Sequence, residues 1–165
     1  MSMPEPWLRG PIEGVHPLVM PVFFSFTMVR EDLAKHTAGL TREQLWRKMD
    51  GASVGFHLKH IAGSVERITA YLMNEQLTEQ QLQSVRDEII PDADLEELLR
   101  RLSNSLAASE QRLRTIEPHS IYDSRAVGRK ALPTTVIGLI VHLAEHTQRH
   151  LGQAISTAKI VRQSG

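Results

Sequence analysis

The stretch at residues 132–159, LPTTVIGLIVHLAEHTQRHLGQAISTAK, organises the rest of the chain. Its apolar residues recur at helical spacing, and it carries His142, His146 and His150 at intervals of four. Residues four apart on an α-helix lie about 6 Å apart along the axis and about 40° apart around it. Two such imidazoles can reach one metal ion, as they do in H-E-x-x-H proteases. Three on one straight helix cannot easily do so, and a metal site here needs a ligand from another segment.

The composition narrows the classes of protein to which the chain can belong. At 165 residues it is long enough for one domain with a substantial core, and we expect a single domain over residues 1–165. Lysine plus arginine equals aspartate plus glutamate at 19 each, so no basic excess favours nucleic acid as a partner. There is no cysteine, which leaves histidine and carboxylate as the strong metal ligands, and histidine is present eight times.

The longest apolar run also argues against a membrane protein. It covers residues 18–29, is interrupted by Pro21, Ser25 and Thr27, and is too short to span a bilayer. The first ten residues lack the basic and apolar regions of a secretory leader. We therefore expect a cytoplasmic protein without a membrane anchor.

Helical periodicity dominates the chain, and no convincing strand pattern accompanies it. Apolar residues at helical spacing predict four long helices at residues 17–39, 53–74, 94–116 and 132–159, with short helices at 41–46 and 78–88. Cap residues mark several starts, namely Thr41, Ser53 and Asp94, and Pro133 with Thr134 is expected to open the last helix. Residues 1–16 read as an irregular arm. The fold class predicted is all-α, a four-helix bundle with that arm and a short extra helix.

The second long helix carries a second pair of histidines. His57 and His60 lie three residues apart beside its apolar stripe. Gly55 and Gly63 weaken its helix propensity, and a helix that keeps such glycines often needs a neighbour to approach closely. Because sites in bundles are built from facing helices, the two histidine helices are expected to pack together.

Three known kinds of metal site fit the histidines poorly. His142, Glu145 and His146 match the inverted zinc protease signature H-x-x-E-H, but no Asp or Glu follows Glu145 to supply a further ligand. A di-iron bundle needs a pair of E-x-x-H elements, and the chain has no such pair. Nothing besides the histidines supports haem. What remains is a mononuclear site with two histidines from the last helix and one from the second, or histidines that are ordinary polar residues.

Two motifs resemble those of the DinB/YfiT-like superfamily. The first is H-x-x-x-H-x-G-Q in the last helix, from His146 through His150 to Gln153, and the second is the segment SVGFHLKHIAGS at residues 53–64. The resemblance covers residues 17–159. It implies a four-helix bundle, a homodimer, and one divalent metal held by His60, His146 and His150. His57 would lie near the site. The extra His142 lies outside the family motif, which leaves open an extended histidine cluster or a supporting role by hydrogen bonding.

The resemblance specifies the metal ligands more closely than it specifies the reaction or the substrate. Members of the superfamily include thiol-dependent transferases and metal hydrolases, which implies a metal-dependent enzyme for a small molecule, with a low-molecular-weight thiol as a possible co-substrate. Zinc or nickel is the expected metal, with iron or manganese as alternatives. Ser64 and Gln153 are candidates for positioning a ligand or substrate, and Arg129 with Lys130 for binding an anion. A non-catalytic metal or small-ligand binding protein linked to stress, and a structural dimer with incidental histidines, are the alternatives.

Overall fold

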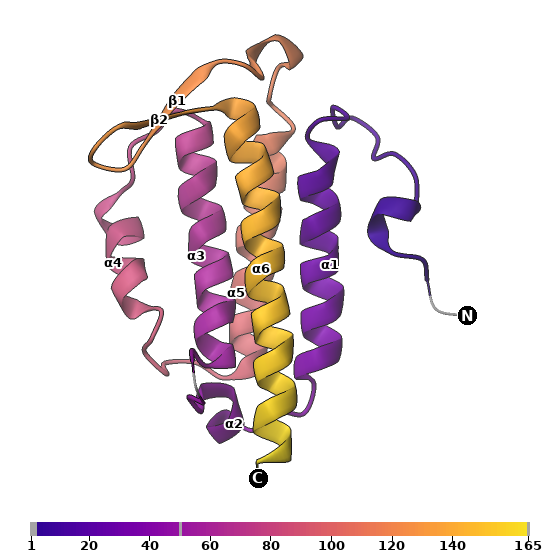
Figure 1. Ribbon diagram of the computed structural model, residues 1–165, viewed down its shortest axis with the longest axis vertical. Helices are drawn as coiled ribbons and strands as arrows, with labels where there is room; N and C mark the ends of the chain where they lie inside the picture. The colour runs from indigo at the N-terminus through magenta and orange to yellow at the C-terminus, as the bar shows by residue number, and fades with distance from the viewer. Residues whose placement is uncertain (1–2, 50, 165) are drawn as a thin grey trace.

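Four long helices form the body of the protein. The structure, a computed structural model, describes residues 3–49 and 51–164. The long helices are α1 (Met20–Thr37), α3 (Val54–Leu72), α5 (Leu95–Leu113) and α6 (Val136–Gln163). They stand side by side, with α6 against α1 and α3, and α5 against α3 and α1 (Figure 1). This arrangement confirms the predicted four-helix bundle, in which the two histidine helices α3 and α6 are neighbours.

Helices α3 and α5 run in the same direction although they follow one another in the chain. The hydroxyls of Thr69 and Ser109 are 2.7 Å apart, and Ser105 donates to Glu66 at 2.5 Å, so both helices advance together. The short helix α4 (Glu79–Asp87) makes this possible, because it returns the chain from one end of the bundle to the other outside α3 (Figure 1). It has no buried residue and lies outside α3 (Figure 1).

Shorter elements connect the helices and cover their ends. They are the 3₁₀ turns η1 (Pro6–Leu8) and η2 (Pro118–Ser120), the helix α2 (Arg42–Trp46), and the strands β1 (Ser124–Val127) and β2 (Leu132–Thr135). The predicted caps at Thr41, Ser53 and Asp94 all accept a backbone N–H from the first turn of their helices. Polar caps satisfy amides that would otherwise lack a partner, and these starts were therefore readable from the sequence.

The connector before α6 is where the sequence prediction was wrong. Strands β1 and β2 form an antiparallel hairpin in which Ser124 pairs with Thr135 and Val127 with Leu132. Each strand has only four residues, which is too short for a period-two pattern to stand out. The turn between them contains Arg129 and Lys130 and is flanked by positive φ angles at Gly128 and Ala131.

The start of α6 also lies later than predicted. Pro133 and Thr134 belong to β2, and the helix begins at Val136 with Thr135 as its cap, whose hydroxyl accepts from the N–H of Gly138 at 3.1 Å. Proline is tolerated in β2 because the hairpin has only two strands and an edge strand need not donate every N–H. The helix then continues to Gln163, beyond the predicted end at residue 159.

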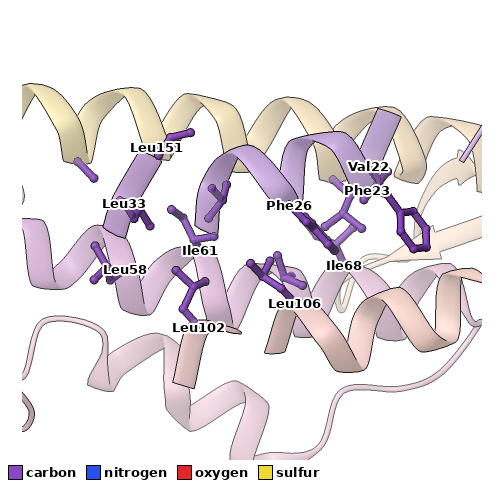
Figure 2. Close-up of a cluster of buried hydrophobic side chains, with 14 of the residues drawn as sticks. Val22, Phe23, Phe26, Leu33, Leu58, Ile61, Ile68, Leu102, Leu106 and Leu151 are labelled. Atoms are coloured by element: carbon purple, nitrogen blue, oxygen red, sulfur yellow. The ribbon is translucent and has the colours of Figure 1, made fainter. Parts of the chain in front are cut away.

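The core lies between the four long helices and consists mainly of apolar side chains. Figure 2 shows side chains from these helices meeting at the centre, among them Phe26, Leu33, Ile61, Leu106 and Leu151. These five residues are at most 2 % exposed. Burying side chains of this size contributes about 1.5–3 kcal/mol each, so this layer is the main source of stability. None of the described helices is long and apolar enough to cross a membrane.

Both glycines singled out in α3 lie against a neighbouring side chain, as predicted. A Cβ atom on Gly55 would lie 2.8 Å from the ring of Trp46. A Cβ atom on Gly63 would lie 2.6 Å from an Arg67 guanidinium nitrogen and 3.1 Å from a carboxylate oxygen of Glu88. The second contact places a buried ion pair directly beside the histidines of α3.

Candidate metal site

Four histidines from two antiparallel helices converge at one side of the bundle, and we call His57, His60, His146 and His150 the histidine cluster. The Nε2 atoms of His60 and His146 are 3.0 Å apart. One ring nitrogen from each of His60, His146 and His150 can be chosen so that all three lie within 4.8 Å of one another. Nitrogens bound about 2.1 Å from one tetrahedral ion are about 3.4 Å apart, so the spacing suits a shared cation.

Glu88 fixes which nitrogen His60 presents to the cluster. The Nδ1–H of His60 donates to Oε2 of Glu88 at 2.7 Å. A carboxylate can only accept, so the proton of a neutral His60 must lie on Nδ1. The Nε2 lone pair then faces His146. Carboxylate–histidine pairs of this kind orient ligands at metal centres.

The carboxylate of Glu88 is buried, with only 3 % of the residue exposed, and it stays ionised. Burial acts to raise its pKa, but the hydrogen bonds from His60 and Arg67 outweigh burial and hold the pKa below the ordinary value. Arg67 donates to Oε1 of Glu88 at 2.9 Å and to the hydroxyl of Ser84 at 3.2 Å. The ion pair compensates the buried charge and connects α3 to the end of α4.

The other end of the cluster has no charged partner of this kind. The Nδ1 atoms of His57 and His150 are 3.2 Å apart, so one donates a hydrogen bond to the other. His57 is 5 % exposed, and its ring meets that of Phe56 edge-on. If His150 is the donor, its Nε2 lone pair is available to a metal, and His57 serves as the acceptor that holds its ring.

Three histidines of the cluster, His57, His146 and His150, have lowered pKa values. Burial, and then the neighbouring histidines, lower the pKa of His57 to about 4. Burial followed by His150 and His60 does the same for His146, whose pKa is also about 4, and burial followed by His60 lowers that of His150 to about 4. Imidazole binds metal only when neutral, so these environments favour ligation at neutral pH.

His146 has one ring nitrogen that faces the cluster and one without a partner. Its Nε2 lies 3.0 Å from that of His60 and is the nitrogen placed to share a cation. Its Nδ1 is the one buried side-chain polar atom without a hydrogen-bond partner in the part of the chain that the structure describes. Unpaired buried polar groups are rare in folded proteins and frequently mark functional sites.

His142 lies one turn before His146 on α6 and has its own carboxylate. The Nδ1–H of His142 donates to Glu145 at 2.8 Å, and Arg149 donates to the other carboxylate oxygen at 2.6 Å. Burial acts to raise the pKa of Glu145, but the bond to His142 and the charge of Arg149 outweigh it, and the pKa is lowered. Both carboxylate oxygens of Glu145 are therefore occupied by His142 and Arg149, and neither hydrogen-bonds to the histidine cluster.

Two cavities flank the histidine cluster. The hairpin-side cavity, of about 500 Å³, is lined by His60, His146, His142, Ser64 and Tyr71 together with apolar side chains. Ser64 is buried and donates within its own helix to the carbonyl of Ile61 at 3.1 Å. This places Ser64, a predicted positioning residue, and His142, the histidine outside the family motif, beside the cluster.

The C-terminal-side cavity, of about 660 Å³, lies beyond the other end of the cluster. It is lined by His57, His150, Arg149, Gln153 and Ser156, among others. The predicted Gln153 is exposed in this cavity, on the opposite side of the cluster from Ser64. Arg129 and Lys130 line neither cavity and lie in the exposed hairpin turn.

Glu88 and Arg67 are the residues of this site that the sequence reasoning missed. Glu88 follows a polar surface helix, and its position in the chain gives no sign that it is buried. The only signal was Gly63, which predicted a close neighbour without identifying it. Twenty-eight residues separate Glu88 from His60, and only the return of the chain through α4 brings them together.

Comparison with known proteins agrees with this architecture. No curated protein matches the chain. Among solved structures, YfiT from Bacillus subtilis, described as a probable metal-dependent hydrolase with an unusual four-helix bundle topology, superposes with a TM-score of 0.64. The match covers 91 % of each chain at 16 % sequence identity, so it supports the fold. A profile of the DinB superfamily matches residues 25–154, and the chain therefore belongs to the DinB superfamily.

Proposed function

We propose that this chain binds one divalent metal ion through His60, His146 and His150 and acts as a metal-dependent enzyme on a small molecule. The observation that carries the proposal is the convergence of three imidazoles from α3 and α6, one of them held by a buried carboxylate. Three neutral histidines leave a coordination position open, as in catalytic rather than structural sites.

The surrounding residues have separable tasks in this proposal. Glu88 holds the proton of His60 on Nδ1, and Arg67 holds Glu88, so the Nε2 lone pair is presented without rearrangement. His57 accepts from Nδ1–H of His150 and keeps that ring in place. When bound, the metal would lower the pKa of a coordinated water or thiol, which supplies a nucleophile at neutral pH.

His142 is the best placed residue to carry a proton. Its Nδ1 is engaged by Glu145, and the ring lines the hairpin-side cavity beside His146. The Nε2 atom is therefore the one able to exchange a proton with a substrate in that cavity. The pairing resembles the general base and its orienting carboxylate in other hydrolytic sites, although here both residues lie on one helix.

Hydrolysis and thiol transfer both remain within this proposal. The printed description of YfiT as a probable metal-dependent hydrolase supports the first. The second needs space for two reactants, and the two cavities beside the cluster supply it. Zinc and nickel suit an all-imidazole site best, with iron and manganese as alternatives. The homodimer and the cytoplasmic location stay predictions.

The competing proposal is a non-catalytic metal-binding protein or a structural bundle with incidental histidines. Metal analysis of untagged protein separates these possibilities. We expect about one divalent ion per chain in the wild type, with occupancy lost in His146→Ala and in His150→Ala. His119→Ala, which removes an exposed histidine elsewhere, is the matched control and should keep its metal. Full occupancy in both cluster variants would overturn the metal site.

The open coordination position distinguishes an enzyme from a storage or structural site. Acetohydroxamate, a small chelating probe, should bind the zinc-loaded protein and should not bind the metal-free protein. A zinc-loaded protein that rejects this probe has a closed site, which would contradict the enzymatic proposal.

A further inference from the structure

Apolar side chains, which make no hydrogen bonds, form a large part of the wall of the hairpin-side cavity. Its apolar wall comes from four elements or their flanks and consists of Ile68, Leu77, Leu82, Val85, Val127 and Leu139. Its volume of about 500 Å³ falls in the range of about 300–1,000 Å³ that is typical of small-molecule sites. The cavity reaches His60 and His146 directly, so a molecule inside it can contact the proposed metal position.

Two apolar residues of α4 are conspicuous in this wall. Leu82 is 43 % exposed and Val85 is 46 % exposed, although both line the cavity. Neither side chain is covered by the bundle, because α4 has no buried residue. A ligand with an apolar body would remove this surface from water, which is favourable by about 25 cal/mol per Å².

The cavity is also free of uncompensated charge. No Asp or Glu is among its lining residues in the described part of the chain. Arg67 is its only Lys or Arg, and its guanidinium is neutralised by Glu88 at 2.9 Å, with 12 % of the side chain exposed. A charged group entering here would lose its hydration and find no free partner of opposite charge.

The C-terminal-side cavity differs in the ligand that it reaches and in the charge of its lining. Arg149 and Gln153 line it beside the apolar side chains of Phe56 and Ile160, and His150 is the proposed ligand that it reaches. The hairpin-side cavity reaches the other two proposed ligands, and its one cationic side chain is neutralised by a buried carboxylate. An uncharged body bound close to the metal is therefore assigned to the hairpin-side cavity.

We propose that the hairpin-side cavity binds the apolar body of an uncharged small molecule whose polar head reaches the metal. The inference rests on the proposed metal function and adds the substrate class. The molecule has an aliphatic or aromatic portion that packs between α3, α4 and α6, and a single metal-binding head at the His60 and His146 end. A charged group at the end of the apolar portion would weaken binding, because the cavity offers it no partner of opposite charge.

A series of alkyl hydroxamates tests this assignment on the zinc-loaded, full-length protein. Calorimetric affinity should rise by about threefold for each methylene added between acetohydroxamate and octanohydroxamate. A probe of the same length that ends in a carboxylate should lose most of that gain. Affinity independent of chain length, with acetohydroxamate still bound, would overturn the cavity assignment while the metal site stands.

Variants on the exposed helix α4 locate the binding without disturbing the core. Leu82→Asp should reduce octanohydroxamate affinity at least tenfold and leave acetohydroxamate affinity and zinc content unchanged. Gln83→Asp adds the same charge to the same helix outside this cavity, and it should change neither probe. If Ser156→Trp blocks the long probe and Leu82→Asp does not, the apolar body lies in the C-terminal-side cavity and the proposal is wrong.

Discussion

The two ends of the histidine cluster differ in the charge of the group that holds the outer histidine. At one end, His60 donates to the ionised carboxylate of Glu88, which Arg67 holds in turn. At the other end, the hydrogen-bond partner of His150 is the neutral ring of His57. A charged hydrogen-bond partner is roughly twice as strong as a neutral one. The comparison shows that His60 is held firmly by a charged partner, whereas His150 is held by a weaker, neutral one.

The largest expected effect comes from removing the charge at the fixed end. Glu88→Gln keeps the volume but replaces the carboxylate, so His60 loses its charged acceptor and Arg67 its ion pair. We expect zinc affinity to fall by about 10–100-fold, the range seen when such outer partners are removed. Competition with a chelator measures the change.

Matched variants decide whether this loss is specific. Glu66→Gln changes a carboxylate on the same helix that contacts Ser105 and no histidine, and it should leave zinc affinity unchanged. His57→Phe, at the neutral end, should weaken zinc binding by less than Glu88→Gln. An equal or larger loss in His57→Phe would reverse the comparison between the two ends.

A smaller effect is expected from filling the space beside the ion pair. Gly63→Ala would place a Cβ 2.6 Å from the Arg67 guanidinium and 3.1 Å from a carboxylate oxygen of Glu88, so the ion pair must shift to make room. We expect weaker zinc binding than in the wild type but stronger than in Glu88→Gln, because the carboxylate remains. Gly152→Ala on α6 is the control, since a Cβ there has nothing within 4 Å, and it should stabilise the helix by about 0.5–1 kcal/mol. Unchanged zinc affinity in Gly63→Ala would show that Arg67 is not needed.

The last prediction concerns acid, which acts on the buried histidines before it acts on Glu88. The pKa of His57 is about 4 in the folded protein and about 6.5 when unfolded. Below pH 6.5 the unfolded chain binds more protons, so stability is lost as the pH falls from about 6.5 to about 4. The pKa of Glu88 is lowered, so the stability it contributes is lost only below about pH 4.5. Between these values His57, His146 and His150 should respond to acid, whereas Glu88 should not.

Thermal unfolding of metal-free protein between pH 7.5 and 4.5 measures this difference. Replacing His57 by Phe should make the melting temperature less sensitive to pH in this window by a few degrees. His119→Phe removes an exposed histidine and should leave the slope as it is in the wild type. A slope that is the same in His57→Phe as in the wild type would contradict a buried, neutral His57.

Local signals allowed most of the bundle to be predicted from the sequence. Apolar periodicity located the long helices, and side chains such as Ser53 and Asp94 marked their starts because caps act within one turn. The sequence did not predict the hairpin, because strands of four residues are too short to show a period-two pattern. The burial of Glu88 was not predicted for a different reason. Its burial depends on a contact with His60 far along the chain, and no local pattern encodes such a contact.

The absence of buried side chains from α4 has a consequence for how long a metal would stay bound. A helix held mainly by exposed and polar contacts opens at a lower free energy than the helices of the core. Glu88 directly follows α4, and each local opening would release the carboxylate from His60. We therefore expect amide hydrogen exchange in α4 to be faster than in α3 or α6, and zinc dissociation to follow the same opening. The residence time of the metal would then be set by the least buried helix of the molecule.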